Sequence, residues 1–144
     1  MTAGGMERKR VFEPPATETT QPFWDATRER QLLLQWCNQC GQVVWFPREA
    51  CPGCLGATLE WRPASGRGEV YACTVEHRPS MPMPNGSDPY VVAIVELDEG
   101  ARLMTNVVGC PPESVTVGMP VQVTWEALSD GRNLPLFEPG RPRT

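Results

Sequence analysis

Residues 37–54, CNQCGQVVWFPREACPGC, decide how this chain folds, because they hold two Cys-x-x-Cys pairs. Cys37 and Cys40 form the first pair, and Cys51 and Cys54 form the second after ten intervening residues. In such a pair the backbone turns so that both sulfurs reach one ion at ~2.3 Å, with backbone N–H groups facing the thiolates. The sequence therefore predicts one four-thiolate metal site, in preference to two disulfide or redox pairs, in a reducing compartment.

The metal that four thiolates bind is zinc or iron. Because four protein ligands leave no position for water, we expect the site to be structural and not catalytic. Iron would make this region an electron carrier, since CPGC at residues 51–54 is similar to a rubredoxin knuckle. Zinc is the prediction, because a rubredoxin has no need of the second domain described below. One zinc ion would also stabilise about forty residues that are too few to build a core alone.

The segments around the cysteines predict a small sheet preceded by a helix. Strands are expected at residues 32–36, 43–46 and 58–61, where short apolar runs end at turns or prolines. Upstream, Pro22 opens the segment PFWDATRERQ, which predicts a helix of two or three turns. Its apolar residues, Phe23 and Trp24, fall on one face of that helix.

Beyond residue 66 the pattern changes to longer strands. A tight hairpin at residues 98–100 and a Pro-rich connection at residues 109–120 separate them. Five strands with a long pause after the third are typical of an OB-type barrel. The expected fold is mainly β: a short N-terminal helix, a rubredoxin-like zinc ribbon and a C-terminal five-stranded OB-fold barrel. The five barrel strands are expected at residues 69–77, 90–97, 102–108, 121–128 and 134–137.

The changes in sequence pattern along the chain set the expected domain boundaries, and its composition limits the fold class and the cellular location. We expect a tail at residues 1–21, the helix and ribbon at 22–65, the OB-fold at 66–138 and a short tail at 139–144. With 13 Gly and 16 Pro in 144 residues, a long-helix bundle is excluded. The sequence shows neither a signal peptide nor an apolar run near the ~20 residues that span a bilayer, so a cytoplasmic location without membrane contact is expected.

Charge and the single histidine restrict the function classes. The net charge is −4, whereas a nucleic-acid-binding surface is normally basic. A histidine-dependent triad could use only His77, and the nearest cysteine, Cys73, lies four residues away in the same expected strand. That spacing corresponds to roughly 13 Å, too far for a hydrogen bond. We therefore expect no catalytic residues, and we interpret Cys73 and Cys110 as small apolar side chains.

The motifs of residues 22 to 140 together resemble a family of acyl-CoA-associated zinc-ribbon/OB-fold proteins, long catalogued only as a domain of unknown function. The likeness rests on PFWDA, CNQCG, PREACPGC, GRGEVYACTVEHR, PYVVAIVELDEGARLMTNVVG, VGMPVQV and LPLFEPG. One departure is Arg30, where members of the family commonly have glycine between the helix and the first ribbon strand.

The resemblance implies a non-catalytic accessory subunit of a thiolase-superfamily acyl-CoA enzyme, in a hetero-oligomer with a thiolase-like protein. One branch of the family partners aldolases that split β-hydroxyacyl-CoA thioesters in steroid side-chain degradation. Another accompanies acetyl-CoA acyltransferases and hydroxymethylglutaryl-CoA synthases. The arginine-rich composition favours the steroid branch, because it suits a GC-rich host.

Two sets of residues are candidates for contacts with a partner or a ligand. An accessory subunit must bury apolar surface against its enzyme, so the first set lies at the helix start and in the Pro-rich loop: Phe23, Trp24, Met81 and Met83. A second candidate function is direct acyl-CoA binding, in which arginines near the ribbon–barrel junction would contact phosphates: Arg48, Arg62, Arg67 and Arg78. A third is single-stranded nucleic-acid binding, and a fourth is electron transfer through iron.

Overall fold

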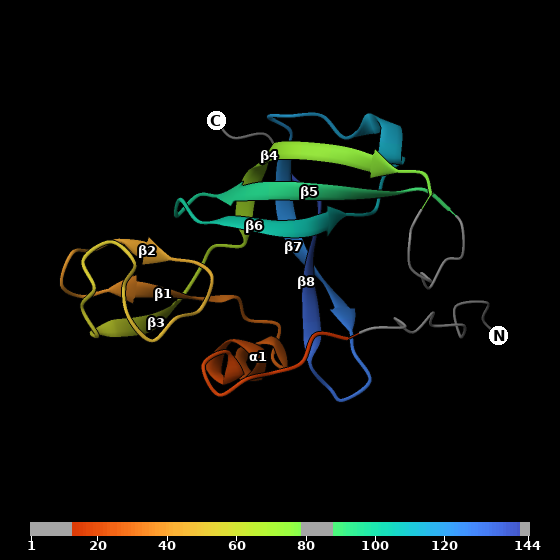
Figure 1. Ribbon diagram of the computed structural model, residues 1–144. Helices are drawn as coiled ribbons and strands as arrows, with labels where there is room; N and C mark the ends of the chain where they lie inside the picture. The colour runs from red at the N-terminus through yellow and green to blue at the C-terminus, as the bar shows by residue number, and fades with distance from the viewer. Residues whose placement is uncertain (1–12, 79–87, 142–144) are drawn as a thin grey trace.

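A helix, a three-stranded sheet and a closed five-stranded barrel follow one another along the chain (Figure 1). The computed structural model describes residues 13–78 and 88–141. Met81 and Met83 lie outside the described residues. Within them, no helix has the length and apolar character needed to cross a bilayer. The mainly β fold with a short N-terminal helix is confirmed.

The helix α1 covers Gln21–Thr27 and buries the face that the sequence predicts. Its first turn contains Pro22, whose missing N–H costs nothing at that position. The helix ends in a Schellman-type turn, in which Gln31 N–H donates to the Ala26 carbonyl and Arg30 N–H to the Thr27 carbonyl. Arg30 has a φ of 57°, the left-handed conformation that favours glycine, which gives a physical reason for the glycine common at this position.

The three-stranded sheet is built around β1, Leu33–Cys37. It pairs antiparallel with β2, Val43–Val44, on one side and with β3, Leu59–Pro63, on the other. The sequence predicts a longer β2, but the pairing stops at Val44, and Trp45 and Phe46 lead into the loop that follows. Conversely, Pro63 does not stop β3: it pairs with Leu33 on an edge strand, where a proline is tolerated.

The barrel closes in the order β4-β5-β6-β8-β7, with β7 returning to β4. All its pairs are antiparallel except that of β6 with β8, where Val107 faces Phe137. The hairpin between β5 and β6 and the five-strand pattern are confirmed, and a 3-10 turn at Pro112–Ser114 lies in the Pro-rich connection. The strands are β4 (Arg67–Glu76), β5 (Tyr90–Leu97), β6 (Arg102–Val107), β7 (Pro120–Ala127) and β8 (Asn133–Pro139).

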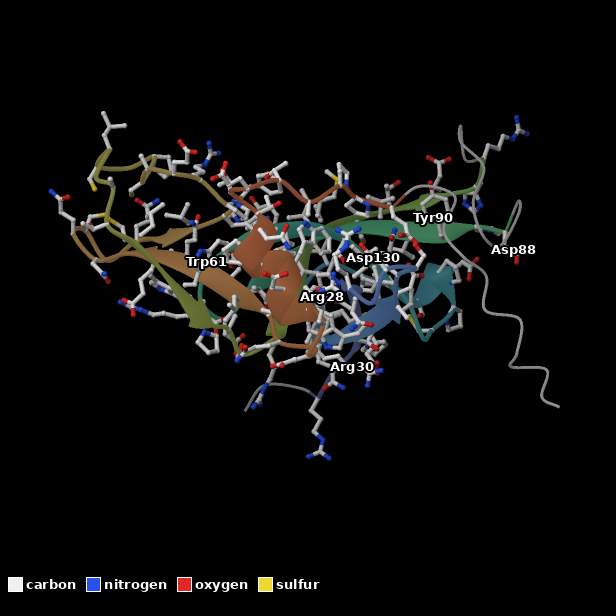
Figure 2. The ribbon with its side chains drawn as sticks, turned by 90° about the horizontal axis from the view of Figure 1, so that it is seen from below. Arg28, Arg30, Trp61, Asp88, Tyr90 and Asp130 are labelled. Carbon is white, nitrogen blue, oxygen red and sulfur yellow. The ribbon has the colours of Figure 1, made fainter. Side chains whose placement is uncertain are left out.

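One main core runs from the barrel interior to the helix. The buried strand residues alternate along β5, and the core continues through Leu34 of β1 to Phe23 and Trp24 of α1. Polar contacts fix the helix to the start of β8, since Asn133 Nδ2 donates to the Thr27 carbonyl at 2.8 Å. Next to it, Arg28 Nη1 donates to the Asp130 carbonyl at 2.7 Å, and Figure 2 shows these two residues side by side.

Candidate metal centre and apolar groove

The four predicted cysteines converge at one point of the ribbon. Their sulfur atoms all lie within 4.8 Å of one another. The Cys37 and Cys54 sulfurs are 3.6 Å apart, and so are those of Cys40 and Cys51. A tetrahedron of sulfurs at ~2.3 Å from an ion has edges of roughly 3.8 Å. The cluster therefore fits one metal ion bound by four thiolates, with no protein position left for a water ligand.

Backbone groups of both Cys-x-x-Cys turns favour the thiolate form. The backbone N–H of Cys40 lowers the pKa of Cys37 to about 6, and its nitrogen lies 3.4 Å from the Cys37 sulfur. In the second turn the backbone N–H of Cys54 lowers the pKa of Cys51. Because a metal binds the thiolate and not the thiol, the turns prepare these two cysteines for coordination.

The two turns are built alike. Gly41 N–H donates to the Cys37 carbonyl and Leu55 N–H donates to the Cys51 carbonyl, both at 2.8 Å. Each turn ends in the left-handed conformation, with a φ of 76° at Gly41 and 64° at Leu55. Gly41 suits this position because glycine adopts a positive φ readily, whereas leucine rarely does, so that Leu55 gives no signal of the turn in the sequence. Leu55 thus adopts in the second turn the conformation that Gly41 adopts in the first.

The loop between the two turns is held by a buried side chain that the sequence patterns do not single out. Gln35 of β1 is 5% exposed. Its Oε1 accepts from the Arg48 N–H at 2.8 Å, and its Nε2 donates to the Arg48 carbonyl at 2.9 Å. These two bonds fix the chain midway between β2 and Cys51. The one signal that could have found it is a glutamine within an otherwise apolar strand.

An apolar groove of ≈ 600 Å³ lies where the helix, the ribbon and the barrel meet. The N-terminal segment before α1 forms part of its wall, and the loop after β2 forms another part. The start of β8 and residues of β6 complete it. Its apolar lining includes Phe23, Trp24, Trp45, Phe46, Met104 and Leu134. The sequence predicts neither the groove nor the roles of Phe46 and Met104, because residues of four separate segments create it.

The helix residues predicted to face a partner are mostly inside the protein. Phe23 is 4% exposed and Trp24 is 7% exposed, and both belong to the main core. Their rings meet edge to face with centroids 5.0 Å apart, and Phe23 also contacts Trp45. Phe23 and Trp24 are therefore core residues, and their contact with a partner stays a prediction. What these side chains leave exposed lines the apolar groove.

The four arginines proposed for acyl-CoA do not converge. Arg48 lines the apolar groove, whereas Arg62 lies on the ribbon sheet and bonds Glu60 and Asn38. Arg67 begins β4 and Arg78 follows its end, so that roughly 35 Å of extended chain separates them. The structure therefore places these arginines in at least three different regions.

The remaining cysteines and the histidine form no reactive pair within the described residues. The Cys73 sulfur lies 3.8 Å from the carbonyl oxygen of Val115, a backbone group that cannot act as a base. Cys73 and Cys110 both pack against the main core. His77 is exposed beyond the end of β4.

Comparisons with known proteins agree with this architecture. Family models described as the rubredoxin-like zinc ribbon domain of ChsH2 and the C-terminal OB-fold domain of ChsH2 match residues 24–60 and 61–126. A DUF35 domain-containing scaffold protein of Methanocaldococcus jannaschii is 38% identical over 109 residues, which cover 74% of this chain and 77% of the relative. A probable enoyl-CoA hydratase alpha subunit of Thermomonospora curvata is 39% identical over 95% of this chain, which spans only 43% of that relative.

A solved structure gives the same result in three dimensions. A chain of the Ltp2-ChsH2(DUF35) aldolase has a TM-score of 0.79 and 37% sequence identity, and the match covers 88% of this chain and 98% of that one. The ribbon, the barrel and the four-cysteine cluster thus agree with sequence relatives and with a solved fold. The chain belongs to the ChsH2/DUF35 family of proteins with a zinc ribbon and an OB-fold.

Proposed function

We propose that this protein is a non-catalytic scaffold subunit of a thiolase-superfamily acyl-CoA enzyme. The observation that carries the proposal is the likeness to a chain of the Ltp2-ChsH2(DUF35) aldolase, because it extends over 98% of that chain. The relative described as a scaffold protein supports the same role. The names of these relatives describe an enoyl-CoA hydratase subunit, a scaffold protein and an aldolase, which favours this role over nucleic-acid binding or electron transfer.

The chemistry of the described residues agrees with a role outside catalysis. A closed four-thiolate site has no position at which a substrate or water could bind the metal. Cys73 would need His77 as its base, but its sulfur faces the Val115 carbonyl while His77 is exposed past the end of β4. This chain would contribute residues that bind the surface of a partner, and not residues that transfer protons.

The metal is proposed to be one zinc ion, held by Cys37, Cys40, Cys51 and Cys54. Four thiolates suit zinc and also iron, but only iron would give a coloured, redox-active protein. Metal analysis of the purified protein is expected to find about one zinc per chain. A red protein with stoichiometric iron would support electron transfer instead.

The reaction proposed for the complex is retro-aldol cleavage of a β-hydroxyacyl-CoA thioester in steroid side-chain degradation. The support is the aldolase named with the similar solved chain, together with the family resemblance of the sequence. The substrate itself would be processed on the thiolase-like subunit.

The test is to co-express this chain with a thiolase-like protein from the same genome and to purify the complex. Cleavage of a steroid β-hydroxyacyl-CoA is then measured for the chain alone, the thiolase-like protein alone and the complex. We expect activity from the complex and none from this chain. If the isolated chain cleaves the substrate and His77→Ala abolishes this activity, the scaffold role is wrong. If the two proteins form no complex, the proposed partner is wrong.

A further inference from the structure

The four cysteines of the metal centre differ in their access to solvent. Cys37 is 1% exposed and Cys51 is 0% exposed, whereas Cys40 and Cys54 reach the surface of the ribbon. Each Cys-x-x-Cys turn therefore contributes one buried and one accessible cysteine. A metal-bound cysteine is a thiolate, and the oxidation of a cysteine follows its thiolate character and its exposure. The two accessible cysteines are thus the points at which an oxidant can reach the site.

Each accessible cysteine has a buried cysteine of the opposite turn as a neighbour. The Cys40 sulfur lies 3.6 Å from that of Cys51, and the Cys54 sulfur lies 3.6 Å from that of Cys37. A disulfide bond is about 2.05 Å long, so that a movement of roughly 1.5 Å would join either pair of sulfurs. Cysteines that sense oxidants are typically accessible and have a second cysteine nearby that resolves the first oxidation product. Both pairs have this arrangement.

We propose that the metal centre is a redox switch, in which a peroxide converts the four thiolates into a Cys40–Cys51 and a Cys37–Cys54 disulfide. This switch goes beyond the scaffold role and rests on the proposed zinc ion. The accessible thiolate of a pair attacks hydrogen peroxide, which leaves a sulfenic acid on the sulfur and releases hydroxide. The buried thiolate then attacks the sulfenic sulfur, forms the disulfide and releases a second hydroxide.

The electrons and the charges of this reaction balance. Two molecules of peroxide are reduced to four hydroxide ions, while four thiolates are oxidised to two disulfides. Because only the thiolate is a metal ligand, the oxidised site releases Zn²⁺. Reduction by a thiol such as dithiothreitol restores the four thiolates, so that the ribbon can bind zinc again.

The pairing decides what happens to the ribbon when the metal leaves. Disulfides between the turns keep the two turns joined, whereas a disulfide within each turn would leave them unlinked. The buried cluster of the ribbon consists of Cys37, Val44 and Cys51. Each cross-turn disulfide includes one buried member of this cluster, so that oxidation changes the packing of the cluster without separating the turns.

The first experiment treats the purified, zinc-loaded full chain with hydrogen peroxide and follows zinc with a chromogenic chelator. We expect release of about one zinc per chain, at about two molecules of peroxide per zinc. Dithiothreitol followed by added zinc should restore the wild-type zinc content. Cys73→Ser is the control, because Cys73 lies outside the cluster, and it should release zinc as the wild type does.

The second experiment maps the disulfides of the oxidised chain. Trypsin separates the first turn, in residues 31–48, from the second turn, in residues 49–67. Disulfides between the turns should therefore give one covalently linked pair of peptides, whereas disulfides within the turns would give two separate peptides. Fragmentation of the linked pair identifies which cysteines are joined. Dimedone, which traps sulfenic acids, should label Cys40 and Cys54.

The outcomes that contradict the switch are distinct from those that contradict the scaffold role. Zinc that stays bound in excess peroxide, disulfides confined to each turn, or dimedone on Cys37 and Cys51 would overturn the switch and leave the scaffold role intact. A reduced chain that contains no zinc would overturn the switch together with the assignment of the metal. Failure to bind a thiolase-like subunit would contradict the scaffold role alone.

Discussion

The ribbon and the barrel differ in the interactions that stabilise each of them. The ribbon has its own small cluster of buried residues, Cys37, Val44 and Cys51, with Leu59 packed against it, so that two of its three buried members are predicted metal ligands. The barrel has a continuous apolar interior and a closed, hydrogen-bonded wall. The barrel thus depends on apolar burial, whereas the ribbon combines the burial of Leu34 in the main core with a cluster of predicted metal ligands.

The largest effect should follow from removing one buried ligand. Cys51→Ser leaves three thiolates, so the protein should lose its zinc and the ribbon should lose several kcal/mol of stability. Cys73→Ser, outside the cluster, is the control and should keep about one zinc per chain. Zinc content together with limited proteolysis would check this. Retention of zinc and of an intact ribbon in Cys51→Ser would contradict the assigned ligand set.

The corresponding change in the barrel is Phe137→Ala. Phe137 is fully buried, and truncating such a ring costs about 3–5 kcal/mol through lost burial and the cavity left behind. Urea unfolding should show this loss, whereas the zinc content should stay at the wild-type value. Simultaneous loss of zinc would mean that the ribbon does not fold without the barrel, and the contrast between the two regions would fail.

A smaller effect is expected at the clamp inside the ribbon. Gln35→Leu keeps the side-chain volume but leaves the Arg48 N–H and carbonyl without their partners, which should cost about 1–3 kcal/mol. Gln122→Leu, at an exposed position of β7, is the control. Denaturant unfolding followed by tryptophan fluorescence measures both. An unchanged unfolding midpoint in Gln35→Leu would show that the two bonds do not hold the loop.

The smallest effect is a gain in stability at the end of α1. Arg30 adopts a positive φ that costs a non-glycine residue about 1 kcal/mol, partly offset by the greater freedom of glycine in the unfolded chain. Arg30→Gly should therefore stabilise the protein by about 0.5 kcal/mol. Arg30→Ala keeps the strain and should give no gain. Thermal unfolding of the two variants compares them directly, and equal midpoints would contradict a backbone origin.

Local patterns in the sequence predict the metal cluster and most of the strands, because each depends on residues close together in the chain. The alternation of Tyr90–Leu97 gives β5 with its observed bounds, and the cysteine spacing gives all four sulfurs of the cluster. Prolines predict the ends of strands less reliably. The strand β2 ends two residues earlier than Pro47 predicts, and Pro63 pairs within β3 where it is expected to end the strand.

The groove could not be predicted in this way. Phe46, Met104 and Leu134 lie far apart in the sequence, and each is unremarkable within its own segment. Only the closure of the barrel and the packing of α1 bring them to one surface. For the same reason the sequence predicts that Phe23 and Trp24 contact a partner but not that they lie in the main core, because an apolar helix face is compatible with both.

The contact of Thr27 with Asn133 joins residues 106 positions apart in the chain. The first helix therefore completes its contacts only after the last strand has been synthesised, although its contact with Trp45 of the ribbon can form earlier. Both cysteine pairs emerge from the ribosome long before β8. The entropic penalty of closing so long a loop, which grows with the logarithm of its length, is met late in folding. A nascent chain can thus take up its metal first, and the site that receives α1 is completed last, when β8 enters the barrel.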